Sequence, residues 1–175
     1  MRIWLLTIGL TLATPAAAEV VSADAHAFEI RHSVSLVMPQ PAAFAAVGRI
    51  QNWWSKDHTY SGNAANLSLD MRPGGCFCER FDGGGGIEHL RVTYIQPGER
   101  VVLSGALGPL LFQAVSGVMD IRVERIAGGS RIAMTYRVAG FAKGNGAELA
   151  PAVDQVLAEQ MKRLRAYAAG TSRSR

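Results

Sequence analysis

The chain has 175 residues, which suits one domain with a sizeable core, and its composition of 49% hydrophobic and 18% charged residues excludes an intrinsically disordered protein. The formal net charge is +4, but the Lys and Arg residues are scattered and form no basic stripe interleaved with aromatic side chains. We therefore expect no nucleic-acid partner. One domain is expected over residues 19–169, followed by a flexible basic tail at residues 170–175.

Residues 1–18 have the pattern of a secretory signal peptide. Arg2 precedes the apolar run IWLLTIGLTLA, and TPAAA ends in the small-x-small pattern that signal peptidase accepts. The apolar run is shorter than the ~20 residues that a membrane-spanning helix needs. We therefore favour cleavage after Ala18 over an uncleaved anchor. The expected protein is periplasmic and bacterial, with no stable membrane anchor after cleavage.

Gly and Pro recur densely after residue 27, and such punctuation is typical of strands separated by tight turns. The pattern predicts strands at residues 27–38, 67–71, 74–81, 87–95, 100–105, 113–126 and 131–140, with two short helices at residues 41–47 and 50–54. The last two strands alternate cleanly between apolar and polar residues. This alternation places Met119 and Ile121 on one inward face, and Met134 and Tyr136 on another.

The segment AELAPAVDQVLAEQMKRLRAYA repeats apolar residues at helical spacing, among them Leu149, Val153 and Leu157. Pro151 fits only in the first turn of a helix, so the helix should begin near Glu148. A curved antiparallel sheet of about six to seven strands would bury the apolar stripe of this helix. The predicted fold class is therefore α+β.

Four segments carry a resemblance to a known superfamily: NWWSKDHTYSG, GGCFCE, EHLRVTYIQPGERVVLSGALGPL and VDQVLAEQMKRL. Together with the order of elements, they resemble the START-like (SRPBCC) helix-grip superfamily, in its polyketide cyclase and Hsp90-ATPase-activator-like branch. The resemblance covers nearly all of residues 19–169 and implies a deep, mostly apolar cavity between the sheet and the C-terminal helix. It implies little about chemistry, because the superfamily contains both carriers and enzymes. The export signal distinguishes this chain from the better-known members, which are mostly cytoplasmic.

Cys76 and Cys78 are the only cysteines of the chain. In a regular strand they share a face and lie ~6.5–7 Å apart, at or beyond the limit for a disulfide. A structural zinc site needs about four ligands, and His89 is the one candidate that could join the pair. We favour two small buried residues beside the cavity, with a bridged or redox-active pair as the alternative. We expect no metal and no cofactor.

The face of the strand that holds the cysteines decides the role of Glu79. If the cysteines face the cavity, Glu79 lies on the outer surface, which is the arrangement we favour. A bulge would instead turn Glu79 into the cavity as a candidate base with a raised pKa. His58 and His89 are the other candidate catalytic residues, although His89 shares a face with Arg91 and is expected to point away from the more apolar face.

The expected function is the binding of a small apolar or amphipathic molecule in the sheet–helix cavity. The expected ligand-contacting residues are Trp53, Trp54, Tyr60, Cys76, Cys78, Phe112, Met119, Met134, Tyr136 and Leu157. The alternative is an enzyme of the cyclase or hydratase type that uses Glu79, His58 or His89 as acid or base. A third hypothesis is a cell-envelope interaction protein with ALGPLLF (residues 106–112) and a bare sheet edge as contact surfaces. The sequence leaves the ligand, the oligomeric state and the redox state of the cysteines open.

Overall fold

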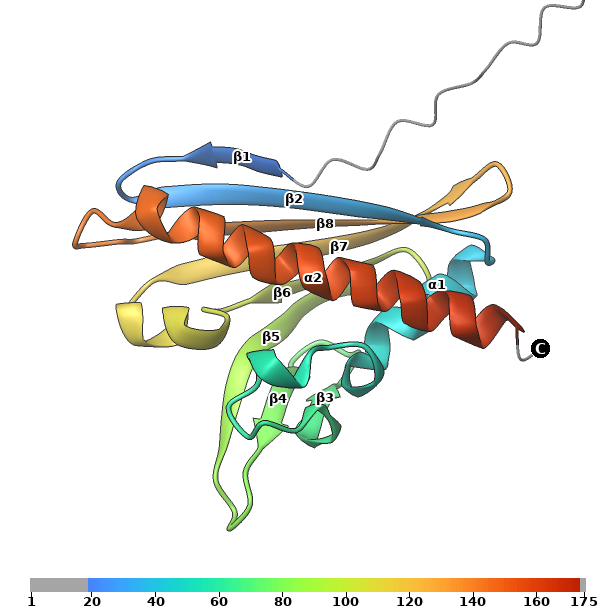
Figure 1. The fold of residues 1–175 in the computed structure, drawn as a ribbon, viewed down its shortest axis with the longest axis horizontal. Coiled ribbons are helices and arrows are strands. Elements are labelled where there is room, and N and C mark those ends of the chain that lie inside the picture. The colour runs from blue at the N-terminus through green and yellow to red at the C-terminus, as the bar shows by residue number, and fades with distance from the viewer. Residues whose placement is uncertain (1–18, 174–175) are drawn as a thin grey trace, which may run out of the picture.

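A computed structural model describes residues 19–173 and shows an α+β protein in which a long helix lies across one face of an antiparallel sheet (Figure 1). The sheet has eight strands in the order β1-β2-β8-β7-β6-β5-β4-β3. The strands are β1 (Glu19–Ala23), β2 (Ala27–Leu36), β3 (Leu67–Leu69), β4 (Cys76–Arg80), β5 (Gly86–Gln96), β6 (Arg100–Ser104), β7 (Ser116–Ile126) and β8 (Gly129–Ala139). The expected signal peptide, residues 1–18, lies outside the described residues.

The strand count is one more than the six to seven expected, because the sequence pattern did not reveal β1. This strand pairs antiparallel with β2 at the edge of the sheet. It is short, Val20 is only half-buried and Val21 is exposed, so it carries little of the alternation that marks a strand in a sequence. The strand predicted first along the chain is therefore the second.

The core lies between the helix and the central strands β2, β8 and β7. These strands pair without a register shift, and their inward residues alternate with outward ones as predicted. The fully or almost fully buried inward residues include Ile30, Met119, Ile121, Ile132, Met134, Tyr136 and Val138. The alternation predicted for the last two strands is confirmed.

The covering helix is α2 (Gly146–Arg173), which begins two residues before the expected start and so places Pro151 in its second turn. Its buried stripe includes Leu157, Met161 and Leu164. A side-chain pair also joins the helix to β2, because His32 Nε2 lies 2.9 Å from Asp154 Oδ1. Among residues 19–173, no helix is long and apolar enough to cross a membrane.

Short helices connect β2 to the far end of the sheet. They are α1 (Gln40–Gly48) and the 3-10 helices η1 (Ile50–Asn52), η2 (Lys56–His58) and η3 (Ala64–Asn66). The two helices predicted at residues 41–47 and 50–54 correspond to α1 and to a shorter η1. Another 3-10 helix, η4 (Gly108–Gln113), joins β6 to β7.

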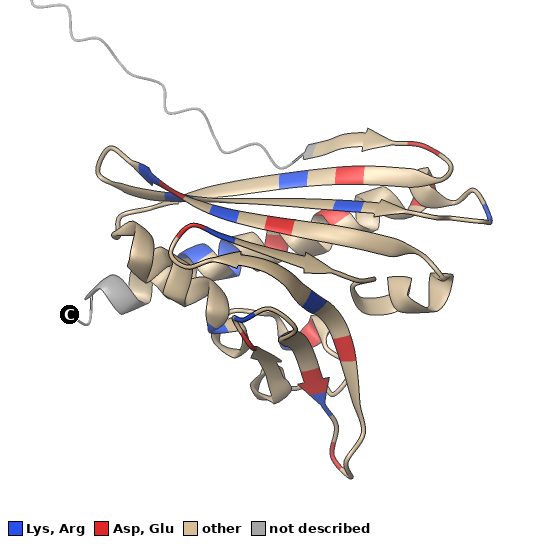
Figure 2. Ribbon diagram, turned by 180° about the vertical axis from the view of Figure 1, so that it is seen from behind, with Lys and Arg blue, Asp and Glu red and all other residues tan. Residues whose placement is uncertain are grey.

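The outer face of the sheet carries charges of both signs in alternation (Figure 2). Arg100 holds Asp120 through two hydrogen bonds of 2.8 Å, and Arg122 approaches the same carboxylate. Glu29 similarly accepts hydrogen bonds from Arg137 and Arg31. The two signs are paired on this face rather than gathered in a field of one sign.

Candidate functional site

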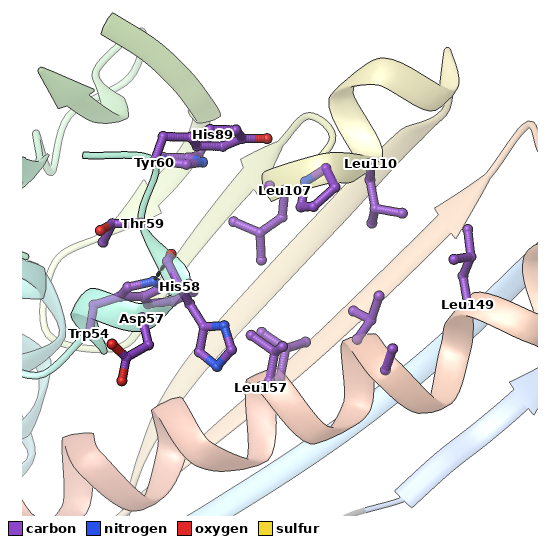
Figure 3. A pocket seen from close by; sticks show the side chains of 15 residues that line it. Trp54, Asp57, His58, Thr59, Tyr60, His89, Leu107, Leu110, Leu149 and Leu157 are labelled. Atoms are coloured by element: carbon purple, nitrogen blue, oxygen red, sulfur yellow. Dashed lines mark hydrogen bonds between the residues drawn. The ribbon is translucent and has the colours of Figure 1, made fainter. Parts of the chain in front are cut away.

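A cavity of about 360 Å³ opens between α2, η4 and the segment around η2 (Figure 3). Its walls are mostly apolar. The helix contributes Leu149, Ala152, Val153, Val156 and Leu157, the η4 region contributes Leu107, Gly108, Pro109 and Leu110, and the opposite wall holds Trp54, Asp57, His58, Thr59, Tyr60 and His89. Strands β4 and β5 bend away from the helix (Figure 1).

The helix has a longer apolar stripe than the sheet covers. Leu157 is fully buried, but Leu149, Val153 and Val156 nearer its start are only half-buried because they face the cavity. The helical spacing predicted this stripe correctly. Part of this apolar stripe is therefore left uncovered by the sheet and lines the cavity.

Tyr136 anchors the η4 roof of the cavity. The backbone N–H of Leu107 donates to the Tyr136 hydroxyl at 2.9 Å, and this hydroxyl lies 3.3 Å from the carbonyl oxygen of Gly105, to which it donates. Burial raises the pKa of Tyr136 to about 12, so the hydroxyl keeps its proton. Gly117 makes room for this contact, since a Cβ there would lie 2.8 Å from the Tyr136 ring.

The segment that forms the opposite wall is held on the helix by side chains of α2. Gln160 Oε1 accepts from the backbone N–H of Ser55 at 2.8 Å, and Arg163 Nε donates to the carbonyl oxygen of Trp53 at 2.9 Å. His58 Nε2 lies 3.1 Å from Glu159 Oε2. His58 therefore lines the cavity but is paired with a helix carboxylate at a partly exposed position.

Glu79 is buried, so its expected position on the outer surface was wrong. Phe77 and Glu79 point inward and the two cysteines point outward. His89 joins Glu79 on the inner face because of the pairing with β5. Phe77 pairs with Leu90 but Cys78 pairs with Glu88, so His89 is an extra residue on β5. This β-bulge buries His89 and Leu90 consecutively, so the outward orientation expected for His89 was also wrong.

The Glu79 carboxylate is fully buried and accepts hydrogen bonds from Tyr60, Ser61 and His89. The backbone N–H of Tyr60 donates to Oε2 at 3.0 Å, the backbone N–H of Ser61 donates to Oε1, and His89 Nε2 lies 3.1 Å from Oε2. Burial alone would raise the pKa of Glu79, but the hydrogen bonds from Ser61, Tyr60 and His89 outweigh it and lower the pKa below its ordinary value. The carboxyl group is therefore ionised, and the raised pKa considered for an inward Glu79 was wrong.

His89 is a neutral imidazole with one nitrogen unpaired. Burial lowers its pKa, although the hydrogen bond and charge of Glu79 partly oppose that effect. Because ionised Glu79 can only accept, Nε2 carries the proton and Nδ1 carries the lone pair. Nδ1 is buried and has no hydrogen-bond partner in the described chain. The ring lies between Phe77 and Tyr60, with centroid separations of 4.8 and 6.0 Å.

The cysteines form a disulfide on the opposite face of β4. Their Cα atoms are 5.4 Å apart, closer than the spacing expected for a regular strand and inside the range for a bridge. Both are half-buried and neither lines the cavity. The favoured interpretation of two small buried residues beside the cavity was therefore wrong, and the bridged alternative is the one observed. His89 faces the other side of the sheet from this pair.

The ten residues expected to contact a ligand lie in different parts of the structure, and only some of them line the cavity. Trp54, Tyr60 and Leu157 line the cavity. Trp53, Met119, Met134 and Tyr136 are buried in the core outside its lining, and Trp53 Nε1 donates to the carbonyl oxygen of Ala46. Phe112 is 73% exposed and contacts Tyr60 edge-on at the outer side of the roof. Leu107 and Leu110 of the cavity roof belong to the ALGPLLF loop, whose apolar character was the signal for them.

The fold and site together define an α+β protein with an eight-stranded antiparallel sheet, a long C-terminal helix and an apolar cavity between them. The sequence matches no protein-family model and no curated protein. Solved structures do match. A protein of unknown function from Staphylococcus aureus has a TM-score of 0.60 at 14% identity, with 85% of this chain and 97% of that chain covered.

Two further solved structures resemble this chain at similarly low sequence identity. An uncharacterized protein from Rhizobium leguminosarum has a TM-score of 0.56 at 19% identity, with 89% and 98% of the two chains covered. A protein from Chromobacterium violaceum has a TM-score of 0.57 at 16% identity, with 80% and 96% covered. At these identities the likeness shows a shared fold alone.

Proposed function

We propose that this chain is an exported small-molecule-binding protein of the START-like, helix-grip type, which takes an apolar or amphipathic ligand in the cavity. The observation that carries the proposal is the cavity itself. Its volume of about 360 Å³ lies at the small end of the range of ~300–1,000 Å³ common for ligand sites, and its walls are mostly apolar. The Cys76–Cys78 disulfide supports the export part of the proposal, because disulfides persist in oxidising compartments such as the periplasm.

Native mass spectrometry of the protein purified from its own periplasm tests the proposal, because a retained ligand adds its mass to the folded chain. A thermal-shift screen of lipids, aromatics and quinones provides the second measurement. Val153→Trp fills the cavity from the helix and should abolish both the retained mass and the thermal shift. Val21→Trp makes the same change at an exposed strand position and should leave both intact. Ligand binding by Val153→Trp equal to that of the wild type would refute the cavity as the site.

A second candidate function is acid–base catalysis of the cyclase or hydratase type. The specific observation in its favour is the buried pair of Glu79 and His89 at the cavity wall, in which a carboxylate fixes the tautomer of an imidazole that keeps one free lone pair. His58 stands apart from this pair, bound to Glu159. Incubation of the retained ligand with wild type and with His89→Gln distinguishes the two functions. Recovery of unchanged ligand from the wild type after many binding cycles would refute catalysis and leave binding.

A further inference from the structure

Among the residues that line the cavity, one buried side-chain atom has no hydrogen-bond partner in the described chain, Nδ1 of His89. This atom restricts the chemistry of a ligand. We infer that the ligand carries a hydroxyl group, a phenol or an alcohol, on an apolar body, and that its O–H donates a hydrogen bond to Nδ1 of His89. The inference rests on the proposed function and adds the class of ligand to it.

The contacts of Glu79 determine which nitrogen of His89 carries the proton. Two backbone N–H groups, of Tyr60 and Ser61, already point at the Glu79 carboxylate, which is the arrangement of an ionised acceptor. His89 Nε2 lies 3.1 Å from the same carboxylate, and because an ionised carboxylate only accepts, this nitrogen must donate. The imidazole then offers an acceptor at Nδ1 and no second donor.

Nδ1 of His89 lacks a hydrogen-bond partner in the described chain. This atom is shielded from solvent, and no described residue donates to it. A buried acceptor without a donor is unfavourable, and buried polar groups in folded proteins are nearly always paired. A ligand that brings a donor into the cavity removes this defect. A ligand of the same shape without a donor leaves it in place.

The apolar side of the wall disfavours anionic ligands, while Asp57, His58 and Thr59 form its polar side. Trp54, Leu107 and Leu157 offer no hydrogen bonds from their side chains to replace the hydration that an ionic group would lose. A carboxylate ligand would also meet the lone pair of Nδ1 and the negative charge of Glu79 just behind the ring. Tyr60 lies next to the imidazole with its ring tilted by 30°, and Figure 3 shows the two side chains together at one end of the cavity. Because Nδ1 is shielded from solvent, a neighbouring side chain has to move before a ligand reaches it, and we assign this movement to Tyr60, which is 44% exposed and lies beside the imidazole.

Three naphthalene derivatives separate these requirements by isothermal titration calorimetry. 2-Naphthol has an O–H donor, 2-methoxynaphthalene has the same ring and oxygen without the donor, and 2-naphthoate carries a charge. Wild type should bind 2-naphthol at least about tenfold more tightly than the ether, and the carboxylate most weakly. His89→Gln keeps an amide N–H for Glu79 but replaces the acceptor fixed by the imidazole ring with an amide oxygen on a flexible chain. This variant should bind the ether as wild type does and lose the preference for 2-naphthol, whereas His26→Gln at a distant exposed histidine should retain it.

The outcomes distinguish the two proposals. Equal affinity of wild type for 2-naphthol and the ether would overturn the inference while the proposed binding function stands. A preference that survives in His89→Gln would overturn it as well. If wild type binds none of the three and the wider thermal-shift screen finds no ligand, the proposed function itself fails, and the inference fails with it.

Discussion

In the centre of the sheet, β2, β8 and β7 pair without a register shift, whereas β5 carries one shift against β4 and another against β6. The regular strands bury a mostly apolar face with Met119, Ile132 and Met134 in the core, and His32 is also buried there. The irregular end buries an ionised carboxylate in contact with an imidazole, Glu79 and His89.

This difference shows how one sheet serves both stability and a candidate site. Strict alternation turns only every second residue of a strand toward the core. A bulge adds a residue to one strand and turns its side chain inward without ending the sheet, and bulges are frequent next to functional sites. Here the added residue is His89, and its partner Glu79 is held by the backbone N–H groups of the segment that also forms the cavity wall.

The largest effect is expected from a truncation in the regular centre. Met134→Ala should lower the free energy of unfolding by about 2–5 kcal/mol, because it leaves a cavity in a closely packed region. Affinity for 2-naphthol should stay within twofold, since Met134 does not line the cavity. Urea denaturation and calorimetry measure the two quantities. Arg131→Ala on the outer face of the same strand is the control, with an expected change within about 0.5 kcal/mol. A loss below 1 kcal/mol from Met134→Ala would contradict close packing of the centre.

A smaller loss of stability is expected at the irregular end. Glu79→Gln keeps the side-chain volume but removes the charge that accepts from Tyr60, Ser61 and His89, and hydrogen bonds to charged groups contribute about 1.5–3 kcal/mol. We expect a loss of this size at pH 7 in urea denaturation, together with a weaker preference for 2-naphthol because the tautomer of His89 is no longer fixed. An unchanged stability would show that the carboxylate is not the group that holds this end together.

The ionisation of Glu79 makes the free energy of unfolding depend on pH, and the direction follows from its pKa. The pKa of Glu79 is lower in the folded protein than its ordinary value of 4.5, so the folded state releases the proton more readily than the unfolded state. Its contribution to stability is therefore complete above pH 4.5 and is lost as the pH falls through the folded pKa. Between pH 7 and pH 3, wild type should lose more stability than Glu79→Gln does. Parallel pH profiles of the two proteins would contradict the assignment.

The contrast also explains which parts of the molecule could be predicted from the sequence. Periodicity located the inward residues Met119 and Met134 and the apolar stripe of α2, because each depends only on neighbours along the same segment. The inward orientation of Glu79 and His89 depends on the register between β4 and β5, which no single strand encodes. A bulge was considered as an alternative for Glu79, but its position on β5 and the presence of His89 beside the carboxylate follow only from the pairing. The edge strand β1 was missed because it buries too little to leave a pattern.

The smallest effect is expected from the disulfide on the outer face of the irregular end. Cys76 and Cys78 are separated by a single residue, and a bridge that closes so small a loop removes little entropy from the unfolded chain, about 1.5 kcal/mol. The double variant Cys76→Ser, Cys78→Ser should lose no more than that in urea denaturation. Its preference for 2-naphthol over the ether should persist, because the contacts of Glu79 on the inner face hold His89 in place without the bridge. A variant that keeps its stability but loses the preference would show instead that the disulfide fixes the register of β4 and thereby the orientation of His89.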